Sequence, residues 1–168
     1  MVRRVIVSLM LAVILTAGYG CDSSDSEAPS APAPAVPSMP PAVATKEAGA
    51  VSDAWLKLID DGKYNDAWDQ TGKWFQGTTS KDAFAKQTAA IRTAMGPLIS
   101  RKTTKSDYTT KIPEGPNGDY VIMHYDTAFK ATSDGMEEVT LEHEKDGTWK
   151  PLGYYLAIKP APKGKSTP

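Results

Sequence analysis

The side chains best suited to acid–base or metal chemistry are the chain's only two histidines, His124 and His143. His124 stands two residues before Asp126, and alternate residues of a β-strand point to the same face of the sheet. A histidine beside a carboxylate can serve as a general base or a metal ligand. Arg101 could complete the set as an anion clamp, or could pair with Asp126 or Glu142 across the sheet. The pattern gives a candidate catalytic set of His124, Asp126 and Arg101, with hydrogen-bonded structural histidines as the simpler alternative.

Three further residues are candidates for lining a ligand pocket. Trp74 lies off the apolar stripe of its predicted helix, and His143 ends the apolar face of a predicted strand. Tyr125 shares one face of another predicted strand with Val121, Met123 and Phe129. Large aromatic rings also dominate core packing, since each buries about 150–250 Å². Burial in the core is therefore the alternative interpretation for the aromatic candidates.

Several classes of function find no support in the sequence. No GxxxxGK[ST], GxSxG or HExxH motif occurs. The aspartates of IDDGKYNDAWD lack the alternating acidic positions and closing glutamate of a calcium loop, and a single cysteine excludes a cysteine-rich zinc site. With 19 basic and 20 acidic residues the formal net charge is -1, so no strong field attracts nucleic acid. We expect no metal, no cofactor and no nucleic-acid partner.

Hydrophobic periodicity predicts three helices ahead of any strand. The first covers residues 46–62, and its apolar stripe consists of Val51, Ala54, Trp55, Leu58 and Ile59. The second covers residues 63–75 and is weakened by Gly72, by about 1 kcal/mol relative to alanine. The third lies within residues 78–97, between a Ser80 cap and the Gly96-Pro97 stop. Its stripe consists of Phe84, Thr88, Ile91 and Met95.

Strand patterns follow over residues 98–112, 119–129, 136–145 and 149–158. A dense turn signal, IPEGPNGD, separates the first two, and Asp146-Gly147 predicts a hairpin between the last two. Pro151 makes the start of the last strand an edge or a bulge. Helices followed by antiparallel strands predict an α+β fold, with the N-terminal helices packed on a curled antiparallel sheet. This order is similar to the cone-shaped nuclear-transport-factor-2-like, or cystatin-like, fold.

The N-terminus predicts export. Arg3-Arg4 precedes a short apolar run over residues 5–17, which is typical of a signal peptide over residues 1–20. The segment Gly18 to Cys21 resembles the lipobox of bacterial lipoproteins, in which cleavage precedes a lipidated cysteine. Gly18 and Tyr19 depart from the usual leucine and small residue. Ordinary cleavage after Gly20 is the alternative, and it would leave an unlipidated Cys21 and a soluble periplasmic or secreted protein.

The rest of the chain divides into a tether, one domain and a tail. Residues 21–44 are rich in proline, alanine and serine and cannot bury enough apolar surface to fold. They predict an extended tether between the lipidated Cys21 and a globular domain over residues 45–158. Residues 159–168 predict a disordered tail. We expect a membrane-anchored lipoprotein of the cell envelope that faces the periplasm.

Four stretches carry a family resemblance. They are AWLKLIDDGKYNDAWDQ (54–70), IRTAMGPLISRK (91–102), PEGPNGDYVIMHYDTAF (113–129) and EEVTLEHEKDGTWKPLGYYL (137–156). Together they resemble the bacterial family known as domain of unknown function 4019. Pro151 departs from that family's usual pattern. The resemblance implies a small exported or lipid-anchored protein and the limits of its domain, but no reaction.

These observations favour a noncatalytic module that binds an unknown small ligand or an envelope protein. The alternative is a small pocket-based enzyme, a hydrolase or isomerase, that uses His124 and Asp126. A third possibility is a purely structural subunit of an envelope complex.

Overall fold

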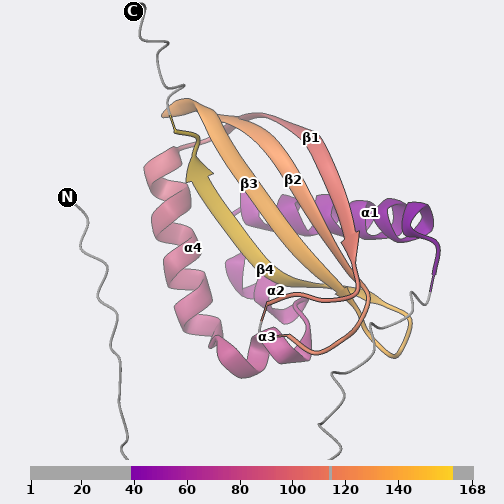
Figure 1. The fold of residues 1–168 in the computed structure, drawn as a ribbon. Coiled ribbons are helices and arrows are strands. Elements are labelled where there is room, and N and C mark those ends of the chain that lie inside the picture. Colours follow the sequence, from indigo (N-terminus) through magenta and orange to yellow (C-terminus); the bar gives the residue numbers. More distant parts are fainter. Residues whose placement is uncertain (1–38, 114, 161–168) are drawn as a thin grey trace, which may run out of the picture. The chain divides into compact units, whose positions relative to one another are not determined.

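The structure is a computed structural model that describes residues 39–113 and 115–160. The predicted signal peptide, Cys21 and most of the predicted tether lie outside the described residues, as does the tail from residue 161. Four helices precede four strands, and the helices lie on one side of the sheet (Figure 1). The helices are α1 (Pro41–Asp60), α2 (Tyr64–Asp69), α3 (Lys73–Thr78) and α4 (Lys81–Met95). The strands are β1 (Leu98–Thr109), β2 (Tyr120–Phe129), β3 (Thr132–His143) and β4 (Trp149–Ile158).

The first helix begins earlier than the sequence predicts. α1 starts at Pro41, so the last residues assigned to the tether belong to the domain. Proline is favoured in the first helical turn, where its missing N–H would have no helical partner. The buried face of α1 is shifted relative to the predicted stripe, and Ala54 is exposed. That face consists of Ala44, Ala48, Ser52, Trp55, Leu56 and Ile59.

The second predicted helix is two short helices instead of one. Gly72 separates α2 from α3 in an extended conformation, and its N–H donates to the carbonyl of Pro151 at 2.9 Å. The Trp68 indole N–H reaches over α3 and donates to the carbonyl of Thr79 at 2.9 Å. Through this hydrogen bond of Gly72, the segment between α2 and α3 is attached to the start of β4.

The last helix has the predicted ends but not the predicted face. The Ser80 side chain accepts from the backbone N–H of Ala83 at 3.3 Å, and Gly96 ends α4 with φ +72°. Phe84 and Thr88 are buried as predicted. The third buried position is Arg92, whereas Ile91 is 40 % exposed. The buried residues of α4 are therefore spaced four apart, and the last of them, Arg92, is a charged side chain inside the domain.

The strands form one antiparallel sheet in the order β1-β2-β3-β4. Register irregularities occur in every pairing, as bulges do where strands bend and twist. β1 ends at Thr109, and β3 begins at Thr132 instead of residue 136. After β4 the backbone N–H of Lys159 still donates to Asp134, so the ordered chain extends past the predicted start of the tail.

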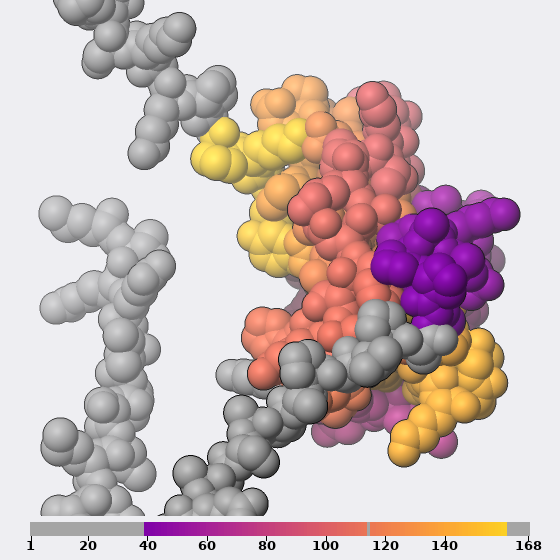
Figure 2. All heavy atoms as spheres, turned by 45° about the vertical axis from the view of Figure 1, so that its right-hand side comes forward, coloured from indigo at the N-terminus to yellow at the C-terminus, as the bar shows by residue number. Residues whose placement is uncertain are grey.

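The main core lies between α1 and the sheet, and α1 lies against all four strands. The Trp55 indole N–H donates to the carbonyl of Ala67 at 2.8 Å, and its ring meets Tyr154 edge-on at 5.6 Å. The first half of α1 also lies beside the β3–β4 turn (Figure 2), where Trp149 Nε1 donates to Glu47 at 3.4 Å. The fold is therefore α+β, with the helices on one face of a curled, unclosed sheet. None of the described helices is long and apolar enough to cross a membrane.

Candidate functional site

Four charged side chains meet on the helix-facing side of the sheet, and we call them the arginine–carboxylate cluster: Asp60, Arg92, Arg101 and Glu137. Arg92 donates to Asp60 at 2.7 Å and to Glu137 at 3.2 Å. Arg101 reaches the same two carboxylates, at 2.7 Å to Asp60 Oδ2 and 2.6 Å to Glu137 Oε2. The cluster joins the end of α1, the end of α4, β1 and β3.

Glu137 is the centre of this cluster. Its side chain is fully buried, and it accepts hydrogen bonds from the Thr127 hydroxyl at 2.7 Å and the Tyr154 hydroxyl at 2.6 Å as well as from both arginines. A buried charge of this kind is tolerated only when its oxygens are fully hydrogen-bonded. β2, β3 and β4 therefore all contribute to holding one carboxylate.

The charges of the cluster balance, two arginines against two carboxylates. Burial would by itself lower the pKa of Arg101, but its bonds to Asp60 and Glu137 outweigh burial and raise that pKa. Burial raises the pKa of Tyr154, and the neighbouring negative charge of Glu137 raises it further. Both groups therefore keep their protons and act as permanent donors. The cluster is a closed structural network more than an acid–base pair.

The structure does not bring the predicted catalytic residues together. His124 and Asp126 alternate with the buried residues of β2 and therefore lie on the sheet face away from the helices, whereas Arg101 faces the helices. His124 Nε2 lies 3.1 Å from Asp107, and its Nδ1 lies 3.3 Å from Glu138. Asp126 pairs with Lys159 at 2.6 Å. Arg101 does not pair with Asp126 or Glu142, because alternation along β1 points it at the opposite face.

The predicted pocket residues also separate. Tyr125 is buried in the core, where its hydroxyl lies 2.8 Å from Ser52 Oγ, and burial raises its pKa to about 12. Trp74 is exposed on α3 and does not line the hollow described next. His143 does line it, with its ring 5.0 Å from that of Trp149. Of the three candidates, only His143 lines the hollow.

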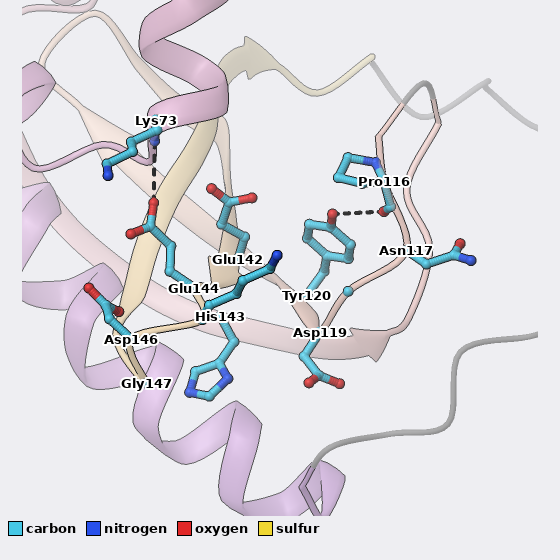
Figure 3. Close-up of a pocket in the computed structure, with 12 residues that line it drawn as sticks. Lys73, Pro116, Asn117, Asp119, Tyr120, Glu142, His143, Glu144, Asp146 and Gly147 are labelled. Atoms are coloured by element: carbon cyan, nitrogen blue, oxygen red, sulfur yellow. Dashed lines mark hydrogen bonds between the residues drawn. The ribbon is translucent and has the colours of Figure 1, made fainter.

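A hollow of about 910 Å³ lies at one end of the sheet, between the β1–β2 loop and the β3–β4 turn (Figure 3). Its walls are residues 116–120 and 142–147 together with Lys73 at the start of α3. Four carboxylates line it, Asp119, Glu142, Glu144 and Asp146, against the two lysines Lys73 and Lys145. The hollow is therefore open, polar and richer in negative than in positive side chains.

Figure 3 shows that Tyr120, Glu142 and Glu144 point to one side of the sheet, while Asp119 and His143 point to the other. Two of these side chains are held in place. The Tyr120 hydroxyl donates to the Pro116 carbonyl at 2.8 Å, and the Lys73 backbone N–H donates to Glu144 at 3.3 Å. The start of α3 therefore holds the wall that carries Glu144, and the bond between Tyr120 and Pro116 holds the wall formed by the β1–β2 loop.

Glu142 differs from its neighbours in having no hydrogen-bond or ion-pair partner within the part of the chain that the structure describes. Burial raises the pKa of its carboxyl group, and the nearby charge of Glu144 raises it further. The carboxylate also lies so close to Gly72 that a Cβ at that position would collide with it. An ionised Glu142 is therefore only partly compensated by the protein.

A comparison with protein families matches a range that contains both the arginine–carboxylate cluster and the hollow. Residues 51–154 match the family described as "Protein of unknown function (DUF4019)". The chain belongs to this family. The matched range includes the whole arginine–carboxylate cluster and the whole hollow. No curated protein matches the chain. Within the described residues, no group of three or more His, Cys, Asp or Glu side chains is placed to hold a metal ion.

Sequence reasoning missed Glu137 and the buried position of Arg92, although each carries a weak signal. Arg92 follows Phe84 and Thr88 at intervals of four along α4, which places it on their buried face. Glu137 is in phase with Val139 and Leu141, the core-facing residues of β3. A charged residue at a core-facing position of this kind indicates a buried partner elsewhere in the chain.

We expect Glu137→Gln to lower the free energy of unfolding by about 3–5 kcal/mol, because it removes the charge that compensates two buried guanidinium groups. Equilibrium urea unfolding would measure the difference. Glu138→Gln is the matched control, since it is the next residue of β3 and points to the opposite face. The control should change stability by no more than about 0.5 kcal/mol. Equal effects at the two positions would contradict the central role of Glu137.

Proposed function

We propose that this chain is an exported, lipid-anchored envelope protein whose domain binds a small ligand in the hollow without transforming it. The observation that carries the proposal is Glu142, a partly buried carboxylate without a partner among the described residues, beside Glu144 in an open hollow of about 910 Å³. Ligand sites commonly have volumes of about 300–1,000 Å³ and a few convergent polar groups.

The lining favours a ligand with a positively charged group. Carboxylates outnumber lysines in the hollow, and Glu144 is already oriented by the backbone N–H of Lys73. Burial and the repulsion from Glu144 raise the pKa of Glu142, and a cationic group placed between the two carboxylates would oppose both effects. A charge-assisted hydrogen bond there would contribute roughly 1.5–3 kcal/mol. Tyr120 also lines the hollow but is almost fully buried, and His143 points to the other side of the sheet in Figure 3.

Two arrangements support binding over catalysis. His124 and Asp126, the basis of the alternative enzyme hypothesis, are each engaged with surface charges on the outer sheet face. Arg101 has its guanidinium bonded to two carboxylates and does not line the hollow.

We also propose the finer assignment of the fold to the cone-shaped nuclear-transport-factor-2-like, or cystatin-like, class. The support is the order of elements, with helices first and then four consecutive antiparallel strands that curl around α1 and α4 (Figure 1). Superposition of an experimental structure on members of that class would check it. A sheet with a different strand order would contradict it.

Binding in the hollow is testable by calorimetric titration of the detergent-extracted full chain with spermidine as a cationic probe and succinate as an anionic one. We expect heat from spermidine and none from succinate. Glu142→Gln should weaken spermidine binding about tenfold or more, the equivalent of losing about 1.4 kcal/mol. Glu138→Gln, on the same strand and the same outer face but outside the hollow, should leave it unchanged.

The same titration has a defined pH dependence. The pKa of Glu142 lies above its ordinary value of 4.5, so its carboxylate takes up a proton, and binding weakens, before the pH has fallen to 4.5. This loss should disappear in Glu142→Gln, which carries no titrating group at that position. Binding of succinate, or an affinity that is indifferent to Glu142, would refute the proposed ligand class.

The proposed anchor predicts a mass. In the membrane fraction, the intact mass of the mature chain should correspond to a sequence that starts at Cys21 and carries a diacylglyceryl group and an acyl chain. Cys21→Ala should abolish this modification. The protein should then accumulate with its signal peptide uncleaved, or it should no longer be attached to the membrane. A wild-type chain that is recovered in the soluble fraction with a free thiol would show that ordinary cleavage occurs instead.

A further inference from the structure

The hollow contains a positive group that the proposed function does not use, the side chain of Lys73. This side chain is exposed and lines the hollow, and within the described residues its ammonium group has no ion-pair partner. Figure 3 shows it near the side chains of Glu144 and Asp146. Hydrogen bonds from Thr148 lower the pKa of Asp146, and the positive charges of Lys150 and Lys73 lower it further. The ammonium group of Lys73 therefore acts on the hollow without being neutralised in an ion pair.

The backbone beside this lysine holds the two glutamates close together. The N–H of Lys73 donates to Glu144 Oε1 at 3.3 Å. A Cβ added at Gly72, the preceding residue, would lie 3.2 Å from the carboxyl carbon of Glu142 and 3.5 Å from Glu144 Oε1. Both carboxylates therefore lie against the chain at the start of α3, next to the residue that carries the positive group.

We propose that the ligand of the hollow is zwitterionic, with an ammonium group that lies between Glu142 and Glu144 and a carboxylate group that the Lys73 side chain binds. A free amino acid is the simplest member of this chemical class. The inference rests on the proposed binding function, and it adds to that function the recognition of a negative group on the same ligand.

The arrangement of charges favours a ligand that carries both signs. A purely cationic ligand between Glu142 and Glu144 would bring its positive charge close to that of Lys73, and the two like charges would repel each other. A purely anionic ligand would be repelled by the two glutamates in the same way. A carboxylate group on the cationic ligand would turn the repulsion by Lys73 into an attraction. Such complementarity contributes to specificity by disfavouring ligands of the wrong charge.

The backbone and the side chain of Lys73 have separable roles. The backbone N–H orients Glu144 and is present whatever side chain residue 73 carries. The side chain is a point charge on a flexible stem, which suits a carboxylate that approaches from the open side of the hollow. Lys73→Met therefore removes the proposed partner of the ligand carboxylate and keeps the backbone N–H that holds the glutamate wall.

Calorimetric titration of the detergent-extracted full chain with free lysine and with cadaverine tests the ligand class. Cadaverine is lysine without its carboxyl group, so the two probes differ only in the group that Lys73 is proposed to bind. We expect lysine to bind about tenfold more tightly than cadaverine, equivalent to about 1.4 kcal/mol. Lys73→Met should remove this preference. Lys102→Met, which removes the same charge from β1 outside the hollow, should keep it.

The outcomes distinguish this inference from the binding function on which it rests. If cadaverine and spermidine bind but lysine binds no more tightly than cadaverine, the zwitterionic class is wrong and cation binding stands. If none of the three probes binds, both proposals are wrong. A preference for lysine that survives Lys73→Met, or that is lost equally in Lys102→Met, would overturn the role of Lys73. Circular dichroism melting would verify that both variants fold.

Discussion

The fold depends on one buried carboxylate. Glu137 has no exposed side-chain surface, and five side-chain hydrogen bonds from four residues hold it. An uncompensated charge in the interior would cost several kcal/mol. Burial of Glu137 in the folded domain therefore requires its four hydrogen-bonding partners, Arg92, Arg101, Thr127 and Tyr154. This requirement couples α4 and all four strands, and Asp60 adds the end of α1 through the same two arginines.

This coupling adds to other polar contacts between the helices and the sheet, among them Tyr125 to Ser52 at 2.8 Å and Trp149 to Glu47 at 3.4 Å. α1 packs on the strands through small and apolar residues, which tolerate sliding. A network with fixed donor geometry does not slide, since a bidentate guanidinium accepts only one orientation of a carboxylate. The cluster therefore specifies the position of α4 relative to β3, and Arg92 fills the space above the Phe129 ring at 4.7 Å. Replacing a whole buried ion pair by apolar residues is often neutral for stability, whereas removing one partner alone is strongly destabilising.

The middle and the C-terminal end of β3 each carry an acidic residue, and the two residues differ in how the protein compensates their charge. Glu137 is buried and fully compensated, whereas Glu142, five residues further along the strand, is partly buried and lacks a partner among the described residues. Fully satisfied polar groups rigidify a structure, and incompletely satisfied ones mark places where a partner can still bind. The distinction supports a rigid domain that carries its binding surface at the loop end of the sheet.

The sequence by itself determined the elements that depend on local chemistry. Ser80 and Gly96 set the ends of α4, Asp146-Gly147 set the hairpin, and alternation set the two faces of β2. It also indicated the α+β class and the family. These signals are read within a few residues, because caps, turns and strand alternation are short-range effects.

Only the tertiary structure decided which charged residues are partners. Asp60 and Glu137 are far apart in sequence, and nothing in either local pattern names Arg92 or Arg101 as the residue that meets both. The same limit explains why His124 and Asp126 remained candidates, since facing one way along a strand does not say which face is covered. Pairing across a fold depends on where the helices lie on the sheet and on the strand register, and both are long-range properties of the packed chain.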